Sequence, residues 1–365
     1  MFQTDPSLNN YITCFVLFNS VLIISYIYAR NDKPKIIVWI LALIFCLFAK
    51  WEQDYFAFRI RFLSEGFRDW RDPAYYYIAQ ISGSSYILFR FFIWGSALLF
   101  FKKTCKRFQL SSNLAIYVLV VLYLLTFSYP RAILAMSIYF YGLSYIVKPT
   151  RLPRTINFLV GFGIIISSYV FHRSLLPLIC LSPLAFFRLT KANFICMMLL
   201  LPIGAFALKN ILFLAMEGEL TQSESLEAFS ESAQLYSSRG GNVSYNWKFA
   251  LILNLRTISI YVVYVYLLWK FIFSKYRIVI HNYIKQYMVI CSCIIAIALI
   301  FFEFVDIGAT GLLGRRYLYM VGIPLAVLLT YAYQYRLCNW KTLNLLLVLS
   351  LMYVEGVLIG KILSY

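Results

Sequence analysis

Long apolar runs recur along the whole chain, with short polar stretches between them. Most of these runs have the length that a helix needs to cross the hydrocarbon core of a bilayer. The pattern predicts about twelve membrane-spanning helices. They are expected at roughly residues 11–29, 36–50, 85–101, 113–129, 131–147, 156–172, 174–187, 193–216, 247–272, 286–302, 317–334 and 342–360. No polar segment is long enough for a soluble domain, so we expect one all-α transmembrane domain over residues 1–365.

The polar connections alternate in charge. One set is rich in lysine and arginine and comprises residues 30–35, 102–107, 148–154, 188–191, 270–285 and 336–341. The positive-inside rule assigns these connections to the cytoplasm, which places both termini outside. The other set is mixed or acidic, and its longest members are outer loops at about residues 51–84, 217–246 and 303–316.

The composition agrees with an integral membrane protein, because 62% of the residues are hydrophobic, 13% are charged and the mean hydropathy is +0.76. A net charge of +18 invites a nucleic-acid function. The cations, however, lie in short clusters between apolar runs and form no continuous basic face, so we expect no nucleic-acid partner. The bilayer itself is the expected partner of the apolar runs.

Two predicted helices, at residues 131–147 and 156–172, flank the basic turn at 148–154. About seventeen residues separate Arg131 from the turn, and a similar number separate the turn from His172, each near one membrane thickness. Arg131, His172 and Arg173 are therefore expected at one depth on the outer side. We interpret them as part of an extracytoplasmic active site for a sugar carried on a lipid diphosphate.

The outer connections carry their positive charge almost entirely as arginine, including Arg59, Arg315 and Arg316. Cations in short outer loops work against insertion, and the planar guanidinium is a good bidentate partner for phosphate. The alternative for an arginine of the first outer loop is pairing with nearby acids or lipid headgroups. Helices that start at the outer face also favour anions at their N-termini, and we expect such starts at Pro130–Arg131, at His172–Ser174 and after the glycine-rich stretch at 308–314.

Two further arginines lie inside predicted spans, where an ionised side chain normally faces a cavity or a partner. Arg90 is close to the outer boundary, so the alternative is that it extends to the interface. Arg256 is deeper, and we expect it to line the cavity.

His172 is the leading candidate for the general base, with Asp54 as its rival and Glu303 and Asp306 as further candidates. A lone histidine is more often structural, but the neighbouring Arg173 and the predicted depth of Arg131 favour a catalytic role. The outer acids show no Asp-x-Asp pair, and the two histidines fall on opposite sides of the membrane. We therefore predict a site without metal or other cofactor, in which arginines offset the charge of a leaving diphosphate.

Four short motifs between residues 50 and 185 form a recognisable series. They are Asp54-Tyr55, Asp72-Pro73-Ala74-Tyr75, Arg131-Ala132-Ile133-Leu134-Ala135 and Phe171-His172-Arg173-Ser174-Leu175. Gly314-Arg315-Arg316-Tyr317 adds a fifth in the second half. Together they resemble the EpsG-like branch of the Wzy-type polysaccharide polymerases. The chain departs from that branch at Asp72, where a Glu-Pro pair is usual, and at Arg173, where a neutral residue is common.

The resemblance implies a GT-C-like glycosyltransferase at the outer face of a bacterial inner membrane, acting in O-antigen, capsule or exopolysaccharide synthesis. Its substrates would be oligosaccharides linked to undecaprenyl diphosphate, and the growing glycan would pass to a sugar hydroxyl of a new lipid-linked unit. Arg131, Arg315 and Arg316 would hold the diphosphate with help from Arg173, near Tyr317. His172 or Asp54 would take the acceptor proton. A chain-length regulator and a flippase are implied as partners.

Two other functions stay open. A related lipid-linked glycosyltransferase or an O-antigen ligase would share the donor chemistry and use another acceptor. A flippase or exporter of the same glycan would need alternating access and often shows paired half-repeats, and we find no internal repeat in the sequence.

Overall fold

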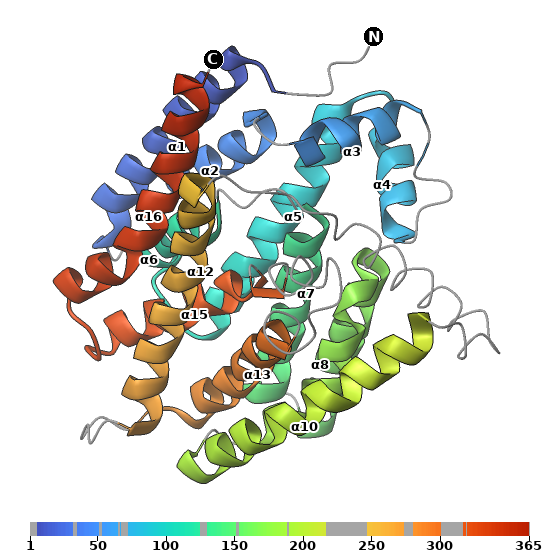
Figure 1. The fold of residues 1–365 in the computed structure, drawn as a ribbon, viewed down its shortest axis with the longest axis vertical. Coiled ribbons are helices and arrows are strands. Elements are labelled where there is room, and N and C mark those ends of the chain that lie inside the picture. The colour runs from blue at the N-terminus through green and yellow to red at the C-terminus, as the bar shows by residue number, and fades with distance from the viewer. Residues whose placement is uncertain are drawn as a thin grey trace.

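The structure is a computed structural model, and every regular element in its described part is a helix (Figure 1). The described residues are 6–31, 35–50, 53–64, 66, 72–124, 130–150, 153–187, 190–216, 247–273, 280–300, 317–318 and 320–364.

The structure describes the following α-helices in chain order. They are α1 (Leu8–Ala29), α2 (Ile36–Phe48), α3 (Gln53–Leu63), α4 (Ala74–Ser82), α5 (Tyr86–Arg107), α6 (Ser112–Leu119), α7 (Pro130–Val147), α8 (Arg154–Phe171), α9 (Leu176–Leu181), α10 (Lys191–Met216), α12 (Trp247–Leu268), α13 (Asn282–Leu299), α15 (Gly322–Gln334) and α16 (Trp340–Leu363). The short segments η2 (Arg173–Leu175) and η3 (Ser182–Phe186) are 3₁₀-helical, and η1 (Val120–Leu124) and η4 (Trp269–Phe273) are π-helical continuations of α6 and α12.

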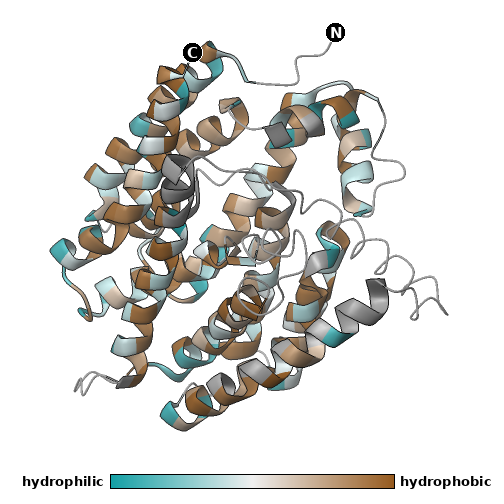
Figure 2. Ribbon diagram, viewed as in Figure 1, coloured by the Kyte–Doolittle hydropathy of each residue, from teal (hydrophilic) through white to brown (hydrophobic). Residues whose placement is uncertain are grey.

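Among the described residues, five helical stretches are long and apolar enough to cross a bilayer by length and composition: Leu8–Ala29, Arg154–Phe171, Leu255–Ile272, Asn282–Leu299 and Trp340–Leu363. Shorter apolar helices lie between them, and hydrophobic residues recur along the helices (Figure 2). Leu345 and Phe206, for example, are each 70% exposed. Such exposure of large apolar side chains is the surface that lipid tails cover. The prediction of an all-α membrane protein is thus confirmed, while the number of twelve spans stays a prediction.

The segment at residues 174–187 differs from its predicted form of one continuous span. It consists of η2, α9 and η3, three short pieces in succession. Pro177 and Pro183 each stand near the start of a piece, where a missing amide hydrogen and the bulk of the ring interrupt a longer helix. The helix start predicted at His172–Ser174 is a single 3₁₀ turn that leads directly into α9.

This broken segment is held against α7 by one tyrosine. The hydroxyl of Tyr139 donates to the carbonyl oxygen of Leu178 at 3.0 Å and lies 2.9 Å from the hydroxyl of Ser182. Tyr139 and Ser182 are both buried. The hydrogen bonds therefore fix the chain that follows His172 to the centre of the bundle.

Helix α7 lies at that centre and packs closely against α8. A Cβ atom added to Gly142 would lie 2.7 Å from the carbonyl oxygen of Gly161, and one added to Gly161 would lie 2.8 Å from the carbonyl oxygen of Gly142. The two backbones thus touch where neither residue has a side chain. The start of α7 and the end of α8 consequently lie at the same end of the bundle, which we call the outer end.

The opposite end, which we call the basic end, carries the turn after α7. The guanidinium Nη2 of Arg107 donates to the carbonyl oxygens of Ser144, at 3.2 Å, and Lys148, at 2.6 Å. The same guanidinium lies 3.6 Å from the ring centre of Tyr145. Burial and the nearby Arg107 lower the pKa of the Lys148 ammonium group. The Ser144 carbonyl also accepts from the Lys148 amide at 3.1 Å, so Arg107 adds a second donor there and supplies one to the Lys148 carbonyl just after α7.

Helices α3 and α4 lie at the outer end, beside the start of α5 (Figure 1). Helix α4 contacts both α5 and α8. The backbone of Tyr75 turns into α4 by donating to the carbonyl oxygen of Asp72 at 3.3 Å, and Pro73 precedes the first helical residue. This arrangement brings Asp72 to the end of α8.

The contact between α7 and α8 predicts a sharp difference between two glycines of one helix. Gly161→Ala would push a methyl group into a backbone oxygen and is expected to destabilise the protein by about 1–3 kcal/mol, as overpacked cores do. Gly163→Ala is the matched control, because a Cβ there meets no atom within 4 Å. It should hold or raise stability, since alanine favours helices. Thermal melting of the purified protein, followed by size-exclusion chromatography, measures both, and equal melting temperatures would contradict the close contact.

Candidate functional site

A histidine and a carboxylate meet at the outer end. The Nδ1 atom of His172 lies 3.8 Å from the Oδ2 atom of Asp72. The Asp72 side chain is almost fully buried, and the His172 side chain keeps 14% of its surface exposed. The pair is therefore accessible from its histidine side and shielded on its carboxylate side.

The backbone around His172 sets the position of the ring. His172 ends α8 in an extended conformation with φ −161° and ψ 101°, and its amide still donates to the carbonyl oxygen of Ser168 at 3.1 Å. The next amide, that of Arg173, donates to Oδ1 of Asp72 at 3.1 Å. The carboxylate thus receives a backbone hydrogen bond on one oxygen and faces the imidazole with the other.

Such a pair suits proton transfer. An imidazole that accepts a proton becomes a cation, and a nearby buried carboxylate compensates that charge. The hydrogen bond from the Arg173 amide holds the carboxylate in place while the ring changes protonation. The geometry therefore places a partly exposed imidazole beside a buried carboxylate at the outer end.

Arg173 itself contributes its amide to this pair, while its side chain is exposed. An exposed guanidinium beside the histidine is available to an anionic group that approaches from the outer side. The substrate-binding role of Arg173 stays a prediction.

Arg90 is buried and bound to protein groups. Its Nη2 atom donates to the carbonyl oxygen of Cys46, near the end of α2, and lies 3.5 Å from that of Ala49. Its guanidinium carbon is 4.6 Å from the ring centre of Tyr55 on α3. Arg90 therefore joins α2, α3 and α5, which supports a positioning role rather than direct substrate contact.

The neighbourhood of Arg90 is aromatic. The hydroxyl of Tyr86 donates to the carbonyl oxygen of Tyr55 at 3.1 Å. Burial raises the pKa of the Tyr55 hydroxyl, and the Arg90 and Arg59 guanidinium groups oppose that shift only in part. Tyr55 thus stays neutral at physiological pH. Arg59 lies on α3 with its side chain exposed.

The other predicted residues that the structure describes lie deeper in the fold. Arg256 of α12 is 2% exposed, and its guanidinium carbon lies 5.6 Å from the ring centre of Tyr353 on α16. It is therefore held at the packed contact between α12 and α16. Tyr317 is also buried, shortly before α15 begins.

Several candidates are only partly covered by the structure or not at all. Asp54 and Arg131 belong to the first turns of α3 and α7, and their side chains lie outside the described part of the protein. Arg315, Arg316, Glu303 and Asp306 lie outside the described residues altogether. Their roles stay predictions.

The second histidine has a partner of its own. The Nδ1 atom of His281 lies 2.8 Å from the hydroxyl of Tyr331, and its backbone amide donates to that hydroxyl at 3.3 Å. His281 precedes α13, far along the chain from the outer-end pair. Within the described ranges no three His, Cys, Asp or Glu side chains cluster as a metal site.

Asp72 is the partner of His172 that sequence reasoning did not assign to the site. It stood out in the sequence as a departure from the family motif, but His172 is far away from it in the chain. The signal that pointed to it was an acid directly before a proline and a tyrosine-rich helix in the first outer loop. The contact with His172 follows only from the packing of α4 against α8.

The described fold is that of an all-helical membrane protein with a polar pair at one end of the bundle. The family model described as EpsG family matches residues 35–362, so the chain belongs to the EpsG family. Membership indicates a function like that of a polysaccharide polymerase. No curated protein and no solved structure matches the chain significantly.

The role of Arg90 is tested by stability. Arg90→Gln shortens the side chain and leaves the last carbonyls of α2 without a charged donor, which should cost about 1.5–3 kcal/mol of folding free energy. Arg59→Gln is the matched control, since it removes the same charge from an exposed position on α3. Thermal melting in one detergent compares the two, and an Arg90→Gln variant that melts with the wild type would contradict the positioning role.

Proposed function

We propose that this protein is a polysaccharide polymerase that joins glycan repeat units carried on undecaprenyl diphosphate at the outer face of a bacterial inner membrane. The growing glycan would pass from its lipid carrier to a sugar hydroxyl of a new lipid-linked unit. The observation that carries the proposal is the pair of His172 and Asp72 at the end of α8, in a chain of the EpsG family.

The reaction needs one bond to form and one to break. The acceptor hydroxyl oxygen bonds to the anomeric carbon of the donor glycan. The bond from that carbon to the diphosphate oxygen breaks, and its electron pair leaves with the lipid diphosphate. The hydroxyl proton passes to the imidazole of His172 through Nε2, the nitrogen opposite the one nearest Asp72, and Asp72 compensates the resulting charge.

The leaving diphosphate needs positive charge around it. Arg131 is proposed for this role because it stands in the first turn of α7, whose N-terminus adds the positive end of the helix dipole. Arg315 and Arg316 enter the proposal from the sequence, and Arg173 supports them from the exposed side of His172. Charge neutralisation and positioning are the main contributions because a diphosphate is already a good leaving group.

This assignment predicts a graded loss of activity. His172→Ala should lower polymer formation by about 10²–10⁴-fold, the usual contribution of a general base. Asp72→Asn should also lower it, by less, because the amide can still accept the Arg173 hydrogen bond but carries no charge. His281→Gln is the matched control and should retain activity. The measurement is the ladder of glycan lengths made from a defined lipid-linked repeat by purified protein.

The same assay separates the alternatives. Polymer made in detergent, where no bilayer divides two sides, is expected from a polymerase and not from a flippase. A ligase would instead consume the lipid-linked glycan only when a different acceptor is supplied. Full activity in the presence of a chelator is expected for a metal-independent site. Wild-type protein that makes no polymer from its own repeat unit would overturn the proposal.

A further inference from the structure

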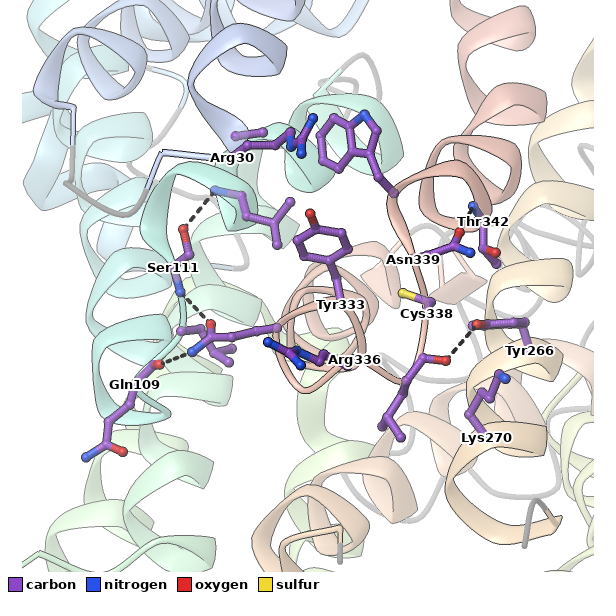
Figure 3. A pocket seen from close by; sticks show the side chains of 16 residues that line it. Arg30, Gln109, Ser111, Tyr266, Lys270, Tyr333, Arg336, Cys338, Asn339 and Thr342 are labelled. Carbon is purple, nitrogen blue, oxygen red and sulfur yellow. Dashed lines mark hydrogen bonds between the residues drawn. The ribbon is translucent and has the colours of Figure 1, made fainter. Parts of the chain in front are cut away.

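A large cavity lies at the basic end, away from His172. Its volume is about 1100 Å³, and it is bounded by the ends of α1 and α15, the starts of α6 and α16, and η4 (Figure 3). Gln109 and Ser111 place it beside Arg107, which binds the last turn of α7 at the basic turn. By the positive-inside rule this end faces the cytoplasm. Nothing in the proposed polymerase reaction uses this cavity.

Three cations from three separate elements line the cavity. They are Arg30 at the end of α1, Lys270 of η4 and Arg336 after α15 (Figure 3). The described residues of the lining include neither aspartate nor glutamate. Hydroxyl and amide groups of Ser111, Asn339 and Thr342 complete its polar wall. This combination of charges and donors fits a phosphate group.

Two residues that line the cavity have an unusual backbone conformation. Gln109 and Arg336 both have φ of 59°, and in the described part of the chain they are the non-glycine residues with positive φ. Arg336 follows the end of α15 at a position where glycine is the common residue. Arg336 is thus a cation at a position where the backbone favours glycine, and it belongs with Gln109 to the lining of one cavity.

Hydrogen bonds also join the connection between α5 and α6 to the end of α15. The side-chain oxygen of Gln334 accepts from the amide of Ser111 at 2.9 Å, and its side-chain nitrogen donates to the carbonyl oxygen of Gln109 at 2.9 Å. These bonds join the end of α15 to the start of α6 (Figure 3). These hydrogen bonds therefore fix two of the segments that line the cavity.

An apolar groove of about 400 Å³ lies next to the cavity. It is lined by side chains of α1, η1 and α16, including Ile23, Val348 and Leu351, together with Tyr117 of α6. The helices α1, α6 and α16 each contribute residues to both the cavity and the groove. Ile23 is 56% exposed and Val348 is 39% exposed, so the groove opens outward.

An aromatic cluster joins the groove to the cavity. Trp340 of the cavity stacks on Tyr117 at 5.8 Å and lies 5.4 Å from Tyr26, both residues of the groove. Its indole nitrogen donates to the Tyr26 hydroxyl at 3.4 Å, and the Arg30 guanidinium lies 5.8 Å from its ring centre. Tryptophan and tyrosine of this kind are typical of the headgroup level of a membrane.

We propose that the basic cavity binds the phosphate headgroup of an anionic membrane lipid whose hydrocarbon chain lies in the adjoining groove between α1 and α16. The positive charge of the cavity favours an anionic headgroup. Because the same three helices line the cavity and the apolar groove, the expected ligand is anionic at one end and apolar at the other. Basic pockets between membrane helices on the cytoplasmic side bind anionic headgroups for the same reason. A soluble phosphate compound would use the cavity and leave the groove without a role.

The test uses full-length purified protein in detergent. Phosphatidylglycerol and phosphatidylcholine with identical chains are titrated in separate samples, and bound lipid is counted by native mass spectrometry. The wild type is expected to bind phosphatidylglycerol more tightly. Arg30→Gln, Lys270→Gln and Arg336→Gly should each weaken this binding by about fivefold, and the three together by roughly a hundredfold. Arg336→Gly keeps the fold because glycine suits the backbone there.

The matched control for charge is Lys106→Gln, which removes an exposed cation of the last turn of α5 that does not line the cavity. It should bind phosphatidylglycerol as the wild type does. A triple variant that also binds as the wild type does would overturn the proposal.

The groove has its own variant pair. Val348→Trp fills the groove and should weaken phosphatidylglycerol binding, whereas Leu345→Trp, on the lipid-facing side of the same helix, should leave it unchanged. Inorganic phosphate and pyrophosphate serve as the soluble probes and should fail to displace the lipid. Full displacement by these ions together with an unaffected Val348→Trp variant would show a site for soluble phosphate and overturn the lipid assignment.

Discussion

The backbone contact between Gly142 and Gly161 is the constraint on which the outer site depends. Two helices that approach this closely can cross the membrane side by side, and their lengths then fix which residues meet at each end. The start of α7 and the end of α8 consequently share one end with α4, where His172 meets Asp72. A bulkier residue at either glycine would separate the helices and change the depth of His172 relative to Asp72.

Arginine serves two purposes in this fold, and the structure separates them. Arg90 and Arg107 donate to carbonyl oxygens near the ends of α2 and α7 and stack on tyrosine rings. Both complete backbone hydrogen bonding that a bilayer cannot supply. Arg173 is different, because its side chain is exposed beside the histidine. Arg90 and Arg107 are thus held by protein groups, whereas the Arg173 guanidinium is accessible from outside the bundle.

Much of the fold follows from the sequence, because the bilayer determines both the length of the apolar segments and the alternating charge of the connections between them. Each predicted span overlaps helical structure, and the hairpin around the basic turn has the expected ends. Pro177 and Pro183 indicated the interruption at residues 174–187, but the apolar composition of the segment led to the prediction of one continuous span. The contact between Asp72 and His172 could not be predicted from the sequence, because it depends on the packing of α4 against α8. The role of Arg90 was also decided by its neighbours, which no local pattern reveals.

The central claim is that His172 and Asp72 act as one proton-accepting unit. A double-variant cycle on the rate of polymer formation tests this claim most directly, using His172→Ala, Asp72→Asn and both together. The account predicts that the double variant is no slower than His172→Ala alone, because a carboxylate without its imidazole has nothing left to assist. Losses that multiply in the double variant, or a His172→Ala protein as active as the wild type, would contradict it.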